Sequence, residues 1–202
     1  MSVLGELQPN KVFKYFEEIC SIPHGSRNLQ QISDYLVDFA KAHELKYRQD
    51  EDLNVIIWKD GSKGYEASEP VILQGHMDMV AVKEADCDKD MEKEGLDMEI
   101  NGDYISAKGT SLGGDDGIAV AYTLAVLDDE EMAHPPIEAI FTVNEEIGML
   151  GAATIDVSDL KGRLFMNMDS EDEGVFTVSC AGGESVICKI PYETETVNAS
   201  VI

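Results

Sequence analysis

Basic residues are scarce in this chain. Its 202 residues include 15 lysines and arginines against 40 aspartates and glutamates, which gives a formal net charge of -25. Such a surface repels the phosphate backbone that a nucleic-acid-binding protein must neutralise, and it repels anionic membranes for the same reason. We therefore expect no nucleic acid and no membrane among the partners, and we expect most of the carboxylates to form a solvated surface.

Long apolar runs are also lacking. No stretch approaches the roughly eighteen consecutive apolar residues that a membrane-spanning helix needs. The opening residues, MSVLGELQPNKVFKYF, do not show the basic start and apolar run that are typical of a secretory signal. Together these absences predict a soluble, cytoplasmic protein.

Cysteines are few and widely spaced. Cys20, Cys87, Cys180 and Cys188 form no CxxC pair, and no histidine stands at zinc-finger spacing from them. The pattern indicates free thiols, and it argues against both a disulfide framework and a zinc finger.

The composition itself, 44% hydrophobic and 7% aromatic, is that of an ordinary globular protein. Apolar residues recur at helical spacing in some segments, and short β-rich runs bounded by turn residues lie between them. Because strands alternate with helices, we expect the α/β class, with a mixed central sheet and helices on both faces, incomplete at the C-terminus. The expected helices are 12–20, 29–40, 117–127 and 148–154; the expected strands are 54–58, 71–74, 137–143, 164–168 and 184–190.

Residues 82–103 interrupt this alternation. They are dense in charge and have almost no periodic apolar signal. We expect an exposed excursion that ends in a turn at Asn101 and Gly102, and we assign no chemistry to it.

Potential metal ligands follow three of the predicted strands. His76 and Asp78 come after one strand, Glu145 and Glu146 after another, and Asp169 after a third. In open α/β sheets, ligands bind outside the carboxyl ends of the strands, so these side chains are expected to meet in one crevice. A lone histidine or a pair of acidic residues is a weak signal by itself, and its repetition at three strand ends is what indicates a site.

A fourth segment adds another carboxylate to this cluster. Asp115 and Asp116 lie in a glycine-rich loop, 113–117, at the start of a predicted helix. Buried carboxylates without partners are costly, and a cation would relieve their mutual repulsion. The sequence therefore predicts a site for zinc or a similar divalent metal, built from one histidine and several carboxylates.

Four motifs, in order, resemble the glutamate carboxypeptidase-like family of di-zinc peptidases: GHMDMV, SLGGDDGIA, FTVNEEIGMLGA and NMDSEDEG. The opening segment VFKYFEEICSIPHGS and the later QDEDLNVII fit the same likeness, which covers almost all of residues 1–183. The resemblance implies the catalytic domain of a di-zinc exopeptidase.

The resemblance also implies a role for each site residue. His76 and Asp169 would bind the first of two zinc ions, and Asp115 would bridge both ions. Glu146 would bind the second ion. Manganese or cobalt could take the place of zinc in such a site.

Two further residues would act beside the metal. The resemblance makes Glu145 the general base, and it makes Asp78 the acceptor of a hydrogen bond from the imidazole of His76, which would set the tautomer of that ring. It also implies a cis peptide bond between Asp115 and Asp116.

The activity that the resemblance implies is hydrolysis of dipeptides, including those that end in histidine, by a zinc-activated water. A homodimer is a possible assembly of the full-length protein. Two alternatives stay open: a related amide hydrolase, such as an aminoacylase or deacetylase, and a metal-binding domain without catalysis. Glu145 favours an enzyme, because a domain that only binds metal has little use for a carboxylate that is not a ligand.

The resemblance further divides the chain. Residues 1–183 correspond to the first segment of the catalytic domain, and residues 184–202 correspond to the start of a lid domain that is cut short. The family pattern requires one more histidine for the second zinc and lid residues that hold the substrate, and neither appears. We therefore expect a truncated copy with little or no activity by itself.

Overall fold

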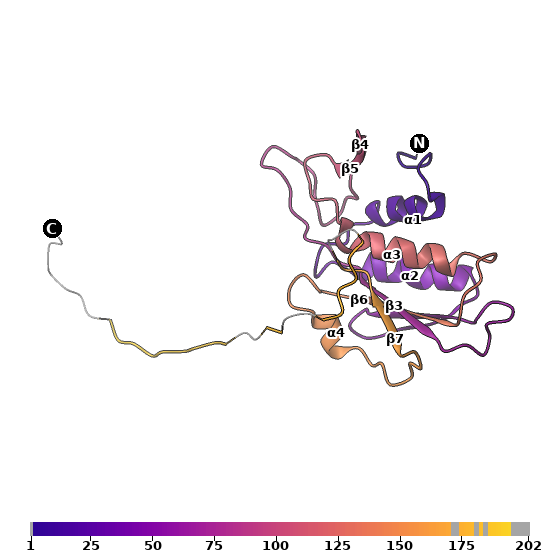
Figure 1. Cartoon of the computed structure of the whole chain (residues 1–202). Helices are drawn as coiled ribbons and strands as arrows, with labels where there is room; N and C mark the ends of the chain where they lie inside the picture. Colours follow the sequence, from indigo (N-terminus) through magenta and orange to yellow (C-terminus); the bar gives the residue numbers. More distant parts are fainter. Residues whose placement is uncertain (1, 171–173, 180–181, 184–185, 195–202) are drawn as a thin grey trace. The chain divides into compact units, whose positions relative to one another are not determined.

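The computed structural model describes residues 2–170, 174–179, 182–183 and 186–194 (Figure 1). The chain divides into two units, Met1–Ser170 and Glu171–Ile202. The helices and strands of the described residues all lie in the first unit. They are α1 (Asn10–Cys20), α2 (Gln30–Ala42), β1 (Lys46–Gln49), β2 (Val55–Lys59), β3 (Val71–His76), β4 (Met98–Asn101), β5 (Tyr104–Ala107), α3 (Gly114–Leu127), β6 (Ile137–Thr142), α4 (Leu150–Thr154) and β7 (Leu164–Asn167).

Five strands form one sheet in the order β1-β2-β6-β3-β7, and β4 pairs with β5 in a separate hairpin. Strand β3 runs parallel to both β6 and β7, whereas β2 runs antiparallel to β6 and to β1. The sheet is therefore mixed, as the sequence predicts. Because β3, β6 and β7 run in the same direction, the segments that follow them leave from one edge of the sheet.

The two faces of this sheet have different surroundings. Ala139 and Phe141 of β6 point to one face and belong to a hydrophobic core shared with α1, α2 and α3. These three helices lie together on one side of the sheet in Figure 1. Ile140 points to the opposite face, because side chains alternate along a strand, and there it shares a cavity of about 260 Å³ with Ala152 of α4. Helices therefore lie on both faces.

Helix α1 illustrates how apolar spacing produces this core. Val12, Phe16 and Ile19 recur at intervals of three and four residues, so they fall on one side of the helix and are all buried. That side packs against α3, whose own apolar residues extend nearly all round the helix. The predicted helices and core strands are confirmed, with bounds that differ by a few residues.

Three strands were not expected from the sequence. Strand β1 is an edge strand of polar residues that are exposed or half-buried, so it has little apolar signal. Strands β4 and β5 form a hairpin around the predicted turn at Gly102, and the excursion of residues 82–103 is therefore partly ordered as strand. A two-residue turn brings the two strands into hydrogen-bonding register. The hairpin therefore forms without the continuous apolar face that would mark it in the sequence.

In the second unit, the predicted strand over 184–190 is not present at residues 186–190, and residues 184 and 185 lie outside the described residues. The backbone N–H and C=O groups of a strand require a neighbouring strand as hydrogen-bond partner. Residues 186–190 do not form a strand with any of the described residues. The proposed start of a lid domain over 184–202 stays a prediction.

Cys20, Cys87 and Cys188 carry free thiols, and Cys180 lies outside the described residues. Among the described helices, none combines the length and the hydropathy needed to cross a bilayer.

Candidate metal centre

The predicted site residues meet at one edge of the sheet. His76 is the last residue of β3, Glu145 follows β6, and Asp169 follows β7. Because these strands are parallel neighbours, their ends bring the three side chains together. Asp115 reaches the same edge from the start of α3, which packs against β3.

His76 lies at the centre of this cluster. Its side chain is 1% exposed, and its Nε2 lies 3.0 Å from Oδ1 of Asp115, 3.8 Å from Oε2 of Glu145 and 4.0 Å from Oδ2 of Asp169. There are two sets of potential ligand atoms, and within each set all atoms lie within 4.8 Å of one another. One set is His76 with Asp115 and Glu146, and the other is His76 with Glu145 and Asp169. Each set of three residues could therefore hold one metal ion.

The division of ligands between two ions is a separate matter. The resemblance implies that Asp169 and Asp115 bind the first ion together with His76, whereas the distances place Asp169 with Glu145 and Asp115 with Glu146. Within the described part of the chain, no second histidine joins either set. The expected division stays a prediction.

Asp78 orients both His76 and Glu145. It is 1% exposed. Its backbone carbonyl lies 2.9 Å from Nδ1 of His76, and its carboxylate Oδ1 lies 3.5 Å from the same nitrogen. The backbone N–H of Glu145 donates to Oδ1 of Asp78 at 3.0 Å, and the hydroxyl of Ser26 donates to Oδ2 at 2.8 Å.

These contacts set the tautomer of His76. A carbonyl oxygen only accepts hydrogen bonds, so Nδ1 of His76 must carry a proton that it donates to Asp78. Nε2 then faces the carboxylates, and in the neutral ring its lone pair is available to a metal. Asp78 acts through its main chain as well as through the carboxylate that the sequence predicts.

Asp115 and Asp116 are joined by a cis peptide bond, as expected. Asp116 is 2% exposed, and its Oδ2 accepts a hydrogen bond from the backbone N–H of His76 at 3.2 Å. Gly75 permits this approach, because a Cβ at that position would come within 2.9 Å of Oδ2 of Asp116. Asp116 thus holds the end of β3 against α3 and does not appear in either set of ligand atoms.

Burial and neighbouring carboxylates raise the pKa of three carboxylates of the cluster more than His76 lowers it. Burial raises the pKa of Asp116 to about 7, with the charges of Asp169 and Asp115 adding to the rise. Burial also raises the pKa of Glu145 and of Glu146, and nearby carboxylates raise both further. Each shift reports that the ionised form lacks compensation.

His76 responds in the opposite direction. Burial by itself lowers the pKa of its ring, but the hydrogen bond and charge of Asp78 and the charge of Asp116 outweigh it and raise the pKa to about 9. The carboxylates therefore favour a positive charge at this position. A divalent cation meets the same demand, and one imidazole nitrogen with several carboxylate oxygens is a donor set that suits zinc.

Two residues of the site were not recognised in the sequence. Ser26 donates to Asp78, and the side-chain carbonyl of Asn144 accepts a hydrogen bond from the backbone N–H of Arg27 at 2.7 Å. The first contact fastens the loop of residues 24–28 to the segment after β3, and the second fastens it to the segment that carries Glu145. No local pattern marks either residue, since each contact joins distant parts of the chain.

Two curated proteins are similar to this chain in sequence. No family model matches the chain. The chain is 39% identical to the cytosol non-specific dipeptidase of Escherichia coli over 199 residues, which cover 98% of this chain and 41% of that protein. It is 30% identical over 113 residues to YqjE, an uncharacterised protein of Bacillus subtilis; these cover 54% of this chain and 28% of YqjE. The chain therefore spans well under half the length of these curated relatives.

Solved structures give the same result. The aminoacylhistidine dipeptidase of Vibrio alginolyticus superposes with a TM-score of 0.82 and 40% identity, covering 85% of this chain and 35% of that one. An aminopeptidase PepT from Bacillus cereus shares the fold, with a TM-score of 0.69 at 21% identity over 82% of this chain and 44% of that one. The resemblance expected from the motifs is thus confirmed: nearly the whole chain is homologous to part of the peptidases that include aminoacylhistidine dipeptidase and cytosol non-specific dipeptidase.

Proposed function

We propose that this chain provides the metal-binding and proton-transferring residues of a two-zinc dipeptidase. One observation supports this above all: His76, Asp115, Glu145, Glu146 and Asp169 come from four segments and converge at one sheet edge. A solvated acidic surface has no reason to surround a histidine that is 1% exposed.

The proposed ligands are those that the resemblance to di-zinc peptidases implies. His76 and Asp169 would hold the first ion, Asp115 would bridge, and Glu146 would hold the second ion. Zinc bound there supplies two kinds of chemistry: it lowers the pKa of a bound water, and it polarises the carbonyl of a peptide. Manganese and cobalt are proposed as substitutes, since they accept the same donors.

Glu145 is the proposed general base. Its carboxylate lies 3.8 Å from Nε2 of His76, and its backbone N–H is held by Asp78. From this position it takes a proton from the attacking water and returns it to the amine that leaves. A raised pKa suits that exchange, because a carboxylate that readily accepts a proton is a better base.

The proposed substrates are short peptides, and dipeptides ending in histidine are the specific class proposed. This proposal is supported by the activities for which two similar proteins are named, a cytosol non-specific dipeptidase and an aminoacylhistidine dipeptidase. Because this chain spans 41% and 35% of their lengths, we propose that it binds metal by itself and hydrolyses dipeptides little or not at all.

Two measurements test the proposal. Titration of the purified chain with zinc should show one tight site and one weaker site, since the second ion has fewer ligands here. His76→Ala should abolish tight binding, whereas Glu145→Gln should retain it, because Glu145 is proposed as a base. Two equally tight sites would contradict the assignment of ligands, and release of histidine from Xaa-His by this chain alone would contradict the proposed dependence on further residues.

A longer protein that contains this chain separates the alternatives. There, Glu145→Gln should remove dipeptide hydrolysis by several orders of magnitude while zinc stays bound. Faster deacetylation of N-acetyl amino acids than hydrolysis of Xaa-His would favour a deacylase. Zinc binding with neither activity would favour a domain that only binds metal.

A further inference from the structure

The loop of residues 24–28, named here the Ser26 loop, is fastened beside the proposed base. The hydroxyl of Ser26 donates to Asp78 at 2.8 Å, and the backbone N–H of Ser26 donates to the carbonyl of Met79 at 3.2 Å. The backbone N–H of Arg27 donates to the side chain of Asn144, the residue before Glu145, at 2.7 Å. These contacts fix the position of Arg27 relative to the site.

The backbone of Arg27 is itself unusual. Its φ of 72° lies in the left-handed region, where residues other than glycine are uncommon, and Asn144, to which it is bonded, has a φ of 53°. Such conformations persist only where surrounding contacts hold them, and they gather at functional sites. This hydrogen bond, between two residues with left-handed backbones, therefore holds the backbone of Arg27 in place next to the segment that carries Glu145.

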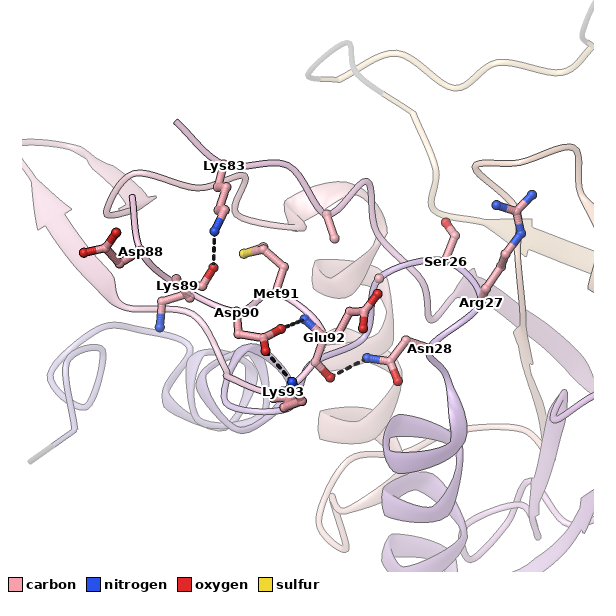
Figure 2. A pocket seen from close by; sticks show the side chains of 12 residues that line it. Ser26, Arg27, Asn28, Lys83, Asp88, Lys89, Asp90, Met91, Glu92 and Lys93 are labelled. Carbon is pink, nitrogen blue, oxygen red and sulfur yellow. Dashed lines mark hydrogen bonds and ion pairs between the residues drawn. The ribbon is translucent and has the colours of Figure 1, made fainter. Parts of the chain in front are cut away.

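Figure 2 shows that direction. The side chains of Ser26 and Arg27 leave the loop on the same side, whereas Asn28 points toward Glu92 and donates to its carbonyl at 2.9 Å. The hydroxyl of Ser26 reaches Asp78 and the backbone of Arg27 reaches Asn144, so the residue that carries the guanidinium lies beside the proposed metal centre.

The surroundings of Arg27 are basic for so acidic a chain. It lines a cavity of about 1040 Å³ between the Ser26 loop and residues 83–93 (Figure 2). In the whole sequence, 40 acidic residues outnumber 15 basic ones. Around this cavity the proportion is reversed, with four cations against three carboxylates: Arg27, Lys83, Lys89 and Lys93 against Asp88, Asp90 and Glu92.

Arg27 differs from the lysines of this cavity in its partners. Lys93 forms an ion pair with Asp90 at 2.6 Å, Lys89 forms one with Asp97 at 3.1 Å, and the ammonium of Lys83 donates to the carbonyl of Lys89 at 2.6 Å. Within the described part of the chain, the guanidinium of Arg27 has neither a hydrogen bond nor an ion pair.

We propose that Arg27 binds a carboxylate of the peptide substrate. The inference rests on the proposed peptidase function and names a group that recognises the substrate. A guanidinium presents a planar fork of N–H donors that matches the two oxygens of a carboxylate, and this pairing is stronger than a neutral hydrogen bond. A peptide offers that group at its C-terminus or on an acidic side chain.

The test follows the Nε–Hε NMR signal of Arg27 in the zinc-loaded chain, identified by its absence in Arg27→Gln. Three probes are titrated: Gly-Gly, Gly-Gly amide, and Asp-Gly amide. The signal should move with a probe that carries a carboxylate and stay in place with Gly-Gly amide. Movement with Gly-Gly identifies the terminal carboxylate as the source, and movement with Asp-Gly amide identifies the side chain.

Variants separate a specific contact from a general effect of charge. Arg27→Gln should raise the Kd of the carboxylate probe on the order of tenfold, the expected size for a hydrogen bond to a charged group. Lys83→Gln removes the same charge from the same cavity and should change the Kd by less than about twofold. Arg27→Lys should fall between them, because it keeps the charge and loses the fork.

Failure of this inference is distinguishable from failure of the proposed function. If the backbone signal of Glu145 moves with Gly-Gly while the Arg27 signal does not, peptides bind at the site and Arg27 is not their ligand. Equal weakening by Arg27→Gln and Lys83→Gln would also overturn the inference. If neither signal moves with any probe, both the inference and peptide binding by this chain are wrong.

Discussion

Strand β6 passes from one kind of environment to another within two residues. Phe141 is fully buried against the helices of the core. The next residue, Thr142, pairs with His76, where the cluster of carboxylates begins. The face covered by α1, α2 and α3, called here the helix-covered face, holds apolar side chains whose burial is favourable. The edge where β3, β6 and β7 end, called here the strand-end edge, holds charged groups that lose solvation. The two regions therefore contribute to stability with opposite signs.

The strand-end edge differs from the core because the surroundings of its carboxylates disfavour their ionised form. Asp116 is buried with one hydrogen bond from the backbone of His76, and burial raises its pKa to about 7. Glu145 and Glu146 have raised pKa values, to which neighbouring carboxylates contribute. Sites that bind ions commonly carry such an imbalance, and the rest of the fold must compensate for it.

The largest expected effect tests the core. Phe141→Ala removes a ring from a fully buried position, which should lower the free energy of unfolding by about 3–5 kcal/mol. Phe165→Ala is the matched control, because Phe165 lies on β7 and is 54% exposed; it should cost under about 1 kcal/mol. Urea denaturation of both variants gives the comparison. Similar losses in the two would mean that the helix-covered face does not dominate stability.

A smaller effect tests the edge. Zinc at about one hundred times its Kd should raise the free energy of unfolding by about 2.7 kcal/mol, because it binds the folded form and compensates the carboxylates. Thermal unfolding with zinc, and again after a chelator is added, measures this difference.

Two carboxylate variants locate the effect of zinc. Asp115→Asn should abolish most of the stabilisation, since Asp115 lies 3.0 Å from Nε2 of His76. Asp52→Asn removes an equal charge from an exposed position and should leave the stabilisation unchanged. Equal stabilisation of all three proteins would place the ion away from the strand ends.

The same contrast explains what could be predicted from the sequence. The core strands and the site were both recognisable, because an apolar run followed at once by His76 or by Glu145 marks a buried strand and its exit. The parallel arrangement then brings the exits together. Strand β1 and the β4-β5 hairpin were missed because their residues are largely exposed or half-buried, so alternation of polarity is weak.

The supporting contacts of the site could not be predicted for a different reason. Ser26 and Asp78 are 52 residues apart in sequence, and Arg27 and Asn144 are 117 residues apart. A hydrogen bond between such residues depends on how the whole sheet and its loops pack. A single serine or asparagine in a loop carries no signal of that partner, so the network around Asp78 emerges only in three dimensions.

Some carboxylates outside the strand-end edge sharpen the comparison, because hydrogen bonds stabilise their ionised form. Glu17 on α1 accepts hydrogen bonds from the hydroxyl of Ser2 at 2.5 Å and from the backbone N–H groups of Val3 and Leu4 at 2.6 and 3.2 Å. Burial raises the pKa of Glu17, but these hydrogen bonds outweigh it and lower the pKa overall. The partners thus favour the ionised form, the reverse of the situation at Glu145.

The smallest expected effect follows from Glu17. A lowered pKa in the folded state stabilises the protein above the pKa that the residue has when unfolded, and this stability is lost as the pH falls through the folded value. Glu17→Gln should therefore cost about 1 kcal/mol near neutral pH, a value kept low by solvent screening. The cost should vanish in acid. Urea denaturation at several pH values measures it, with the exposed Glu6→Gln as control. A cost that is independent of pH would show that Glu17 acts through packing and not through its charge.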